Sequence, residues 1–159
     1  MPFSLINFIH SFFIPHRHAQ MTITRFCIVR HGETDWNAEK RLQGQIDISL
    51  NAVGQAQAMA LRAHLKKAPP FTAVYSSDLA RAWHTAQIAT TDLGLAVSPA
   101  PSFRERHYGT HQGLTSAEAA HAHPAMYHLH QARDLHYTYD TRESLAAFAP
   151  RIQPQLSIL

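Results

Sequence analysis

The residues best suited to chemistry form the run Arg30-His31-Gly32-Glu33, which directly follows the apolar residues 26–29. A guanidinium can bind an anion through two parallel hydrogen bonds, and a glycine lets the backbone approach that anion closely. An imidazole can act as a nucleophile. An apolar run that ends in such residues is typical of a buried strand whose carboxyl end holds a ligand. The run therefore predicts a site at which His31 attacks a bound anion.

Two later segments carry residues that fit the same chemistry. In SSDLARA (residues 76–82), Arg81 comes near the start of a predicted helix, where free backbone N–H groups favour anions. In RERHYG (residues 104–109), Glu105 is a candidate acid that could protonate a leaving oxygen. Arg104 and Arg106 flank Glu105 and would lower the pKa of its carboxyl group. The alternative for this segment is therefore an exposed ion-pair cluster. The alternative for Arg81 is an arginine on the solvated face of a helix.

Together these three segments resemble the histidine phosphatase superfamily, the phosphoglycerate-mutase-like enzymes, over about residues 24–159. The resemblance implies that His31 becomes phosphorylated and that Glu105 donates the proton. It also implies phosphate- or substrate-binding roles for Arg30, Asn37, Gln43, Gly44 and Arg81. An ordinary loop or capping residue is the alternative for Asn37. Thr115 and Ser116 follow Gly113-Leu114, where a lysine would indicate a glycolytic mutase, so a phosphatase fits better.

The activity implied by the resemblance is hydrolysis or transfer of the phosphoryl group of a small phosphorylated metabolite. A phosphosugar, a phosphoglycerate and α-ribazole phosphate all fit as substrates, and no cofactor is implied. Seven of the thirteen histidines lie in residues 107–136, which raises the alternative of a metal site. The pairs His121/His123 and His128/His130 have a spacing that points to different faces of a helix, so neither pair can chelate one ion. We therefore predict no metal.

The sequence departs from the family pattern at its carboxyl end. The family carries a second histidine on a strand that follows the last helix, whereas residues 141–145 resemble only the start of that helix. We therefore expect a domain that is incomplete at its C-terminus and lacks the final strand and helix. One alternative to an active phosphatase is then an impaired relative that only binds phosphorylated ligands. A fragment without function and a phosphoglycerate mutase are the others.

Composition supports one globular domain. The chain has 159 residues, of which 45% are hydrophobic and 16% charged, which argues against a disordered chain. The net charge is +3 and no dense run of Lys or Arg occurs, which argues against nucleic-acid binding. The single cysteine, Cys27, lies in an apolar strand and is read as a buried hydrophobic residue. One cysteine forms no internal disulfide, and we expect a cytoplasmic protein.

The leading residues differ in character from the rest. Residues 3–14 read FSLINFIHSFFI, which is too short to span a bilayer and has no preceding Lys or Arg to mark a signal peptide. Met21 stands just before the first predicted strand of the domain. We expect residues 1–20 to be an extension outside the domain and residues 21–159 to form the domain. A membrane-surface anchor is the alternative, but we predict no membrane partner.

Strands and helices alternate along the chain, which favours a three-layer α/β/α sandwich with a mainly parallel sheet. Strands are predicted at residues 24–30 and 71–75, with a further extended piece from Val97. Helices are predicted at residues 51–67 and 79–93, after the capping box at Thr115, and from Pro124. A last helical stripe (Leu145, Phe148, Ile152, Leu156) is expected to be broken by Pro150 and Pro154.

Overall fold

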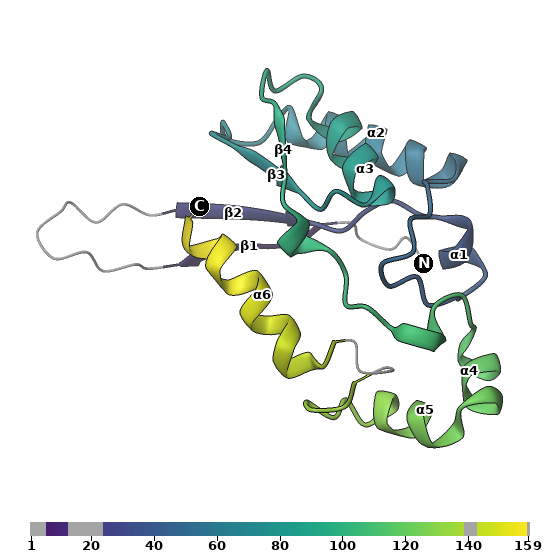
Figure 1. Cartoon of the computed structure of the whole chain (residues 1–159). Coiled ribbons are helices and arrows are strands. Elements are labelled where there is room, and N and C mark those ends of the chain that lie inside the picture. Colours follow the sequence, from purple (N-terminus) through teal and green to yellow (C-terminus); the bar gives the residue numbers. More distant parts are fainter. Residues whose placement is uncertain (1–5, 13–23, 139–142, 159) are drawn as a thin grey trace, which may run out of the picture.

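The computed structural model describes residues 6–12, 24–138 and 143–158, and it has the predicted α/β architecture. Helices α2 (Ala52–Leu65) and α3 (Ala80–Thr90) lie on one side of the strands, and α6 (Leu145–Ile158) lies on the other side (Figure 1). Helices α4 (Ser116–Ala122) and α5 (Pro124–Gln131) form a separate corner of the molecule. The layered arrangement leaves the ends of the strands facing the loops that carry the predicted site.

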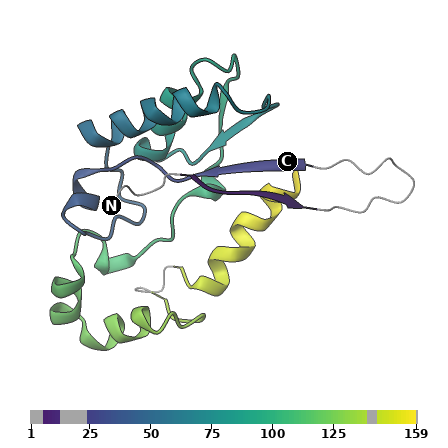
Figure 2. The same ribbon diagram turned by 180° about the vertical axis from the view of Figure 1, so that it is seen from behind.

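The described strands form two ladders of opposite kind. Strand β3 (Val74–Ser76) pairs in parallel with β4 (Val97–Pro99), as a mainly parallel sheet requires. Strand β2 (Thr24–Val29), for which the predicted sheet implies parallel pairing, instead pairs antiparallel with β1 (Ile6–Phe12) (Figure 2). In the described residues no backbone ladder joins β2 to β3. The predicted class is therefore confirmed, while the direction of pairing at β2 differs from the prediction.

The leading segment takes part in this pairing. Residues 6–12 include apolar and aromatic residues, which favour strands, and they add a strand along one edge of β2. We expected residues 1–20 to lie outside the domain, and the structure differs on this point for the stretch that it describes. Residues 1–5 and 13–20 lie outside the described residues. The domain boundary at residue 21 stays a prediction.

A small apolar core joins the helices to β2. Leu61 and Leu65 of α2 meet Ala89 of α3, and Cys27 and Val29 of β2 pack against this cluster. Burial raises the pKa of the Cys27 thiol, which fits a packed side chain better than a nucleophilic one. The next residue of β2, Ile28, points the other way and is 56% exposed, because side chains alternate between the faces of a strand. The core thus anchors the strand that leads into His31.

Caps fix where the helices begin. The Asn51 side chain accepts the N–H of Gly54 at the start of α2, and Thr115 and Glu118 form the predicted capping box of α4. Helix α5 begins at Pro124, also as predicted. A short helix, α1 (Asp35–Ala38), stands within the segment that the sequence predicted as loop-rich. Two short 3₁₀ turns, η1 (Pro101–Phe103) and η2 (Gly109–His111), lie between β4 and α4.

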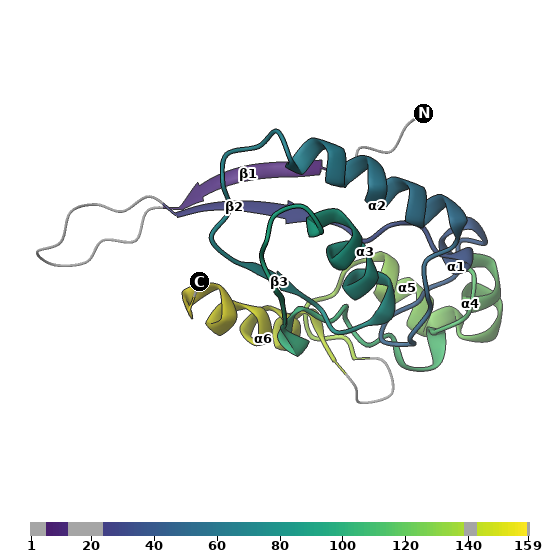
Figure 3. The ribbon, with the colours of Figure 1, turned by 90° about the horizontal axis from the view of Figure 1, so that it is seen from above.

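Helix α6 runs through both of its prolines. We expected Pro150 and Pro154 to break this stripe, but one helix spans Leu145–Ile158 (Figure 3). Each proline removes one backbone donor, yet the side chain of Arg151 fastens the helix to neighbouring segments. Tertiary contacts of this kind override local propensity. The helix thereby reaches the segment that contains Glu105.

Candidate active site

His31 lies in the loop that follows β2, and one of its ring nitrogens forms a hydrogen bond within this loop. Its Nδ1 lies 2.7 Å from the carbonyl oxygen of Gly32. A carbonyl can only accept, so Nδ1 carries the hydrogen and Nε2 keeps its lone pair in the neutral ring. Burial lowers the pKa of His31 to about 4, and the cations of Arg81 and Arg30 act in the same direction. The imidazole is therefore uncharged at neutral pH and presents Nε2 as a nucleophile.

The loop around His31 is fastened by hydrogen bonds from two helices. The N–H of Gly32 donates to the Thr85 hydroxyl of α3 over 2.9 Å, and that hydroxyl donates to the carbonyl of Arg81 over 2.6 Å. Glu33 is held from the start of α2, since its carbonyl accepts the Asn51 N–H and its carboxylate accepts the Asn51 amide, both over 3.0 Å. These bonds fix the nucleophile relative to α3, on which Arg81 lies.

Arg81 lies at the start of α3 and is only 2% exposed. Its guanidinium donates to the carbonyls of Gly44 over 2.6 Å and of Ile46 over 2.9 Å. A guanidinium has five donors, so further N–H groups remain for an anion. Gly44 has a φ of +54°, a backbone conformation that suits glycine and turns its carbonyl toward Arg81. The alternative of a solvated arginine is therefore wrong.

The amino end of α3 differs from the prediction in one respect. We expected its free N–H groups to favour a bound anion, but the Ala80 N–H donates to the Asp47 carboxylate over 2.6 Å. The protein thus supplies its own anion at this helix end. Arg30, by contrast, is exposed and forms no ion pair with any other residue that the structure describes. Within the described residues, the charge of Arg30 is thus not neutralised by a paired carboxylate.

Asn37 and Gln43 lie in the segment after His31 and differ in their surroundings. The side-chain carbonyl of Asn37 accepts the Thr34 N–H over 3.1 Å in the capping box of α1, which is the alternative that we kept open. Its phosphate-binding role stays a prediction. Gln43 is only 7% exposed, and its Oε1 has no hydrogen-bond partner among the described residues. A buried acceptor without a hydrogen-bond partner fits a residue that lines a ligand site, as predicted for Gln43.

Glu105 projects from the segment after η1 and is exposed. Its carboxylate accepts the backbone N–H of Arg106 over 2.7 Å and the Tyr108 hydroxyl over 3.4 Å. The two flanking guanidiniums are directed elsewhere. Arg104 forms a bidentate pair with Asp78, and Arg106 donates to the carbonyls of two other segments over 2.9 and 3.0 Å. Glu105 is thus available as a proton carrier beside the cationic residues.

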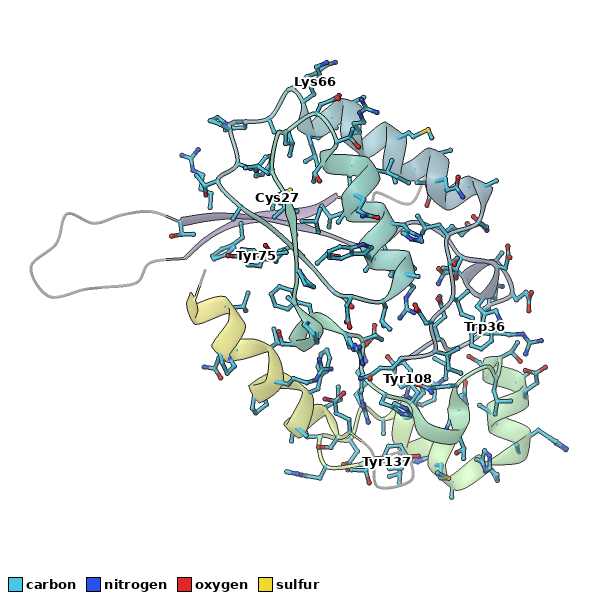
Figure 4. All side chains as sticks on the ribbon, turned by 45° about the horizontal axis from the view of Figure 1, so that its top comes forward. Cys27, Trp36, Lys66, Tyr75, Tyr108 and Tyr137 are labelled. Atoms are coloured by element: carbon cyan, nitrogen blue, oxygen red, sulfur yellow. The ribbon has the colours of Figure 1, made fainter. Side chains whose placement is uncertain are left out.

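Tyr108 lies beside the corner of the molecule that α4 and α5 form (Figure 4), and its hydroxyl donates to the Glu105 carboxylate over 3.4 Å. Burial raises the pKa of Tyr108 to about 12, and the nearby Glu105 carboxylate adds to this effect. The phenol therefore stays protonated and donates to Glu105. Gln112 holds this segment to the loop before α2, because its Oε1 accepts the N–H groups of Gln45 over 2.9 Å and of Tyr108 over 3.3 Å. Sequence reasoning missed Gln112, since no spacing pattern marks it.

The charged groups act on one another across a single site. Arg81 and Arg30 both lower the pKa of His31. Burial lowers the pKa of Arg81, and Glu105 and Asp47 partly offset that effect. The structure therefore brings the predicted residues Arg30, His31, Arg81 and Glu105 into one electrostatic neighbourhood, with Gly44 in direct contact with Arg81.

A clamp formed by Arg151 of α6 and by Glu143, which lies just before that helix, fixes the segment that carries Glu105. Arg151 pairs with the Glu143 carboxylate over 2.7 Å and donates to the Ser102 and Arg104 carbonyls over 2.5 and 2.9 Å. Glu143 in turn accepts the His107 N–H over 3.3 Å. Sequence reasoning treated this stretch only as the start of a helix. The pairing of an acidic and a basic residue eight positions apart was the available signal.

The histidine-rich stretch does not build a metal centre in the described part of the chain. His111 is fully buried and its ring lies 5.4 Å from that of His123. Among the described residues no group of three or more His, Cys, Asp or Glu side chains could hold an ion. The same part of the chain contains no helix long and apolar enough to cross a membrane.

Comparison with known proteins gives a consistent result. Residues 26–159 match the model of the histidine phosphatase superfamily, branch 1. The chain is 48% identical over 106 residues to a metal-independent phosphoserine phosphatase of Arabidopsis thaliana, covering 66% of this chain and 44% of the relative. It is 43% identical over 98 residues to a glucosyl-3-phosphoglycerate phosphatase of Mycobacterium tuberculosis, covering 62% and 44%. The chain thus spans less than half the length of these relatives.

Solved structures agree with this result. A mycobacterial glucosyl-3-phosphoglycerate phosphatase in complex with VO3 superposes with a TM-score of 0.74 at 36% identity, covering 81% of this chain and 63% of that one. A Thermus thermophilus protein, TTHB049, superposes with a TM-score of 0.68 at 35% identity, covering 82% and 70%. Sequence and structure therefore match the same group of proteins.

Proposed function

The chain belongs to the histidine phosphatase superfamily, branch 1, and we propose that it hydrolyses small phosphate monoesters through a phosphohistidine at His31. The observation that carries the proposal is the state of the His31 ring. Its Nδ1 is committed to the Gly32 carbonyl and its pKa is lowered to about 4, so Nε2 is an uncharged nucleophile. No metal or cofactor is needed for this chemistry, and a reducing, cytoplasmic location stays our expectation.

The first half of the reaction transfers the phosphoryl group to the enzyme. Nε2 of His31 attacks phosphorus while the bond to the leaving oxygen breaks, and Glu105 gives that oxygen its proton. Arg30 and Arg81 neutralise charge on the non-bridging oxygens as the transition state forms. In the second half, the Glu105 carboxylate takes a proton from water, which attacks phosphorus and releases phosphate from His31. The Tyr108 hydroxyl supports Glu105 by hydrogen bonding to its ionised form.

Relatives support a phosphatase and leave the substrate open. The two phosphatases compared above are named for phosphoserine and for glucosyl-3-phosphoglycerate. We propose that the substrate of this chain is a small phosphorylated metabolite. A 2,3-bisphosphoglycerate-dependent phosphoglycerate mutase of Lachnoclostridium phytofermentans is 38% identical over 100 residues. A mutase would return the phosphoryl group to an alcohol instead of water. Thr115, which caps α4 after Gly113-Leu114, favours the phosphatase.

Turnover of p-nitrophenyl phosphate by the full chain tests the proposal. We expect turnover that excess EDTA leaves unchanged and that His31→Ala abolishes. His84→Ala is the matched control, because His84 is an exposed histidine of α3 outside the contacts described above. Undiminished turnover in His31→Ala, or loss of the wild-type rate in EDTA, would contradict the mechanism. A chain that binds phosphate esters without turnover would indicate an impaired, ligand-binding relative.

A further inference from the structure

The loop of residues 43–46 binds Arg81, and direct hydrogen bonds join this loop to the segment that carries Glu105. No step of the proposed reaction uses the residues that form these bonds. A proton donor acts only within hydrogen-bond reach of the oxygen that it protonates, so the rate depends on where Glu105 lies relative to the bound phosphoryl group. The residues that join Glu105 to the loop around Arg81 therefore bear on catalysis.

One peptide unit of this loop, between Gly44 and Gln45, is held at both of its ends. Its carbonyl accepts the Arg81 guanidinium over 2.6 Å, and its N–H donates to the Gln112 Oε1 over 2.9 Å. A methyl group at Gly44 would overlap that oxygen and would lie 2.9 Å from the Gln112 Cδ, so the Gln112 amide lies directly against this peptide. Because a peptide unit is planar, a shift of the Gln112 oxygen also turns the carbonyl that Arg81 binds.

The same oxygen of Gln112 holds the segment of the proton donor. It accepts the Tyr108 N–H over 3.3 Å, and the Tyr108 hydroxyl donates to the Glu105 carboxylate over 3.4 Å. A second hydrogen bond runs beside this route, because the side-chain amide of Gln45 donates to the Glu105 carbonyl over 3.0 Å. Gln112 and Gln45, which we call the glutamine bridge, therefore connect the loop around Arg81 to Glu105.

The backbone beside Gln112 keeps the bridge in place. The N–H of Gly113 donates to the Leu42 carbonyl over 2.8 Å, and the Leu42 N–H donates to the Leu114 carbonyl over 2.9 Å. These two bonds hold the chain after Gln112 against the start of the loop around Arg81. Both groups that the Gln112 side chain binds are N–H donors, so the atom that accepts them is the amide oxygen. An acceptor is therefore the property that this position requires.

From these contacts we infer that Gln112 and Gln45 are positioning residues, which hold the proton donor Glu105 at a fixed place relative to the phosphoryl group bound by Arg81. The inference rests on the proposed function, because it takes the roles of Arg81 and Glu105 from it. Neither glutamine exchanges a proton or forms a bond to phosphorus, and both act through the groups that they hold. Loss of the bridge therefore impairs the reaction most where the leaving oxygen needs a proton.

Two esters that differ in this need test the inference. The alkoxide of glycerol phosphate requires a proton to leave, whereas the nitrophenolate of p-nitrophenyl phosphate leaves without one. Gln112→Met keeps the length of the side chain and removes the oxygen. We expect it to lower kcat for glycerol phosphate about 100-fold, as for a catalytic group displaced by about 1 Å, and kcat for p-nitrophenyl phosphate far less. Gln112→Glu keeps an oxygen acceptor and should recover most of the rate.

Three further variants separate positioning from a general loss of structure. Gln87→Met changes an exposed glutamine of α3 and should leave both esters unaffected. In a Glu105→Gln background, Gln112→Met should add little further loss, because the acid that it positions is already absent. If Gln112→Met does not fold, Gln45→Met carries the test, since it removes the side-chain donor to Glu105 and keeps the backbone N–H. Equal losses on both esters in the bridge variants, or losses that add fully to those of Glu105→Gln, would overturn the inference.

Hydrogen exchange of the Tyr108 N–H tests the bridge without turnover, with inorganic phosphate as the probe. We expect phosphate to slow this exchange in the wild type, because the anion orders Arg81 and the bridge passes that order to Tyr108. Gln112→Met should abolish the slowing. A wild type that turns over neither ester, but in which phosphate protects Tyr108, would contradict the proposed function alone. Exchange that phosphate leaves unchanged in the wild type, or slows equally in Gln112→Met, would overturn the inference.

Discussion

Gly54→Ala should destabilise the protein, although helix propensity alone predicts that it stabilises it. Gly54 lies in the first turn of α2, and an exposed helical glycine replaced by alanine ordinarily gains about 1 kcal/mol. Here a methyl group at Gly54 would lie 2.6 Å from the nitrogen and 2.9 Å from the carbonyl carbon of Glu33, and closer still to the Glu33 oxygen. Those backbone atoms adjoin Gly32 and His31. The helix start and the His31 loop therefore cannot both keep their positions.

The magnitude follows from these distances. Contacts below 3.0 Å require the loop to move. Because all three contacts fall below that distance, we place the cost at about 2–3 kcal/mol, the upper part of the range for forcing extra volume into a packed site. After the propensity gain is subtracted, we expect a net destabilisation of about 1–2 kcal/mol, or roughly 2–8 °C in Tm for a chain of this length. Displacing a catalytic group by about 1 Å costs on the order of 100-fold in rate. Activity should thus fall far more than stability.

Urea denaturation and p-nitrophenyl phosphate turnover measure the two effects separately. Ala60→Gly is the matched control, because Ala60 is exposed in the same helix and reports propensity without touching the loop. We expect the control to cost about 1 kcal/mol and to leave turnover unchanged. A Gly54→Ala protein that is more stable than the wild type and equally active would refute the reasoning.

Three further predictions concern the acid, the nucleophile and the leading strand. Glu105→Gln should slow an alkyl phosphate about 100- to 10,000-fold and p-nitrophenyl phosphate far less, since nitrophenolate leaves without a proton; equal losses on both esters would argue against an acid role. The pKa of His31 in the folded protein is about 4, below its ordinary 6.5, so its contribution to the free energy of unfolding is present above pH 6.5 and is lost as pH falls toward 4. For the same reason the acid limb of kcat/KM due to His31 should lie near pH 4. Calorimetry and a pH–rate profile check both, and an acid limb of His31 at pH 6.5 would contradict its burial. Deletion of residues 1–20 unpairs one edge of β2 and should lower Tm, whereas an unchanged Tm would place the domain boundary at residue 21 as the sequence predicted.

Sequence reasoning succeeded where chemistry and local pattern coincide. The run around His31, the capping box at Thr115 and the start of α5 at Pro124 are local signals, and each predicts its element within a few residues. The residues Arg81 and Glu105 were found because their segments resemble a family. Periodicity alone would have left both as surface charges.

The rest depends on contacts that are remote in sequence. The Thr85 hydroxyl meets the Gly32 N–H across 53 positions, and Gln112 meets Gln45 across 67 positions, so neither pairing has a local signature. Helix α6 passes through two prolines because tertiary contacts from Arg151 outweigh the lost backbone donors. The pairing of β1 with β2 likewise depends on an edge that only the folded sheet presents.

The central claim is that His31 carries the phosphoryl group. The direct test is to mix the chain with a phosphate ester, quench in alkali, which preserves phosphohistidine, and map the modified peptide by mass spectrometry. We expect a single phosphoryl group on His31, absent from His31→Ala, and lost when the labelled protein is placed in acid. A phosphoryl group on Ser76, Ser77 or Asp78, or turnover without any phosphorylated enzyme, would contradict the account.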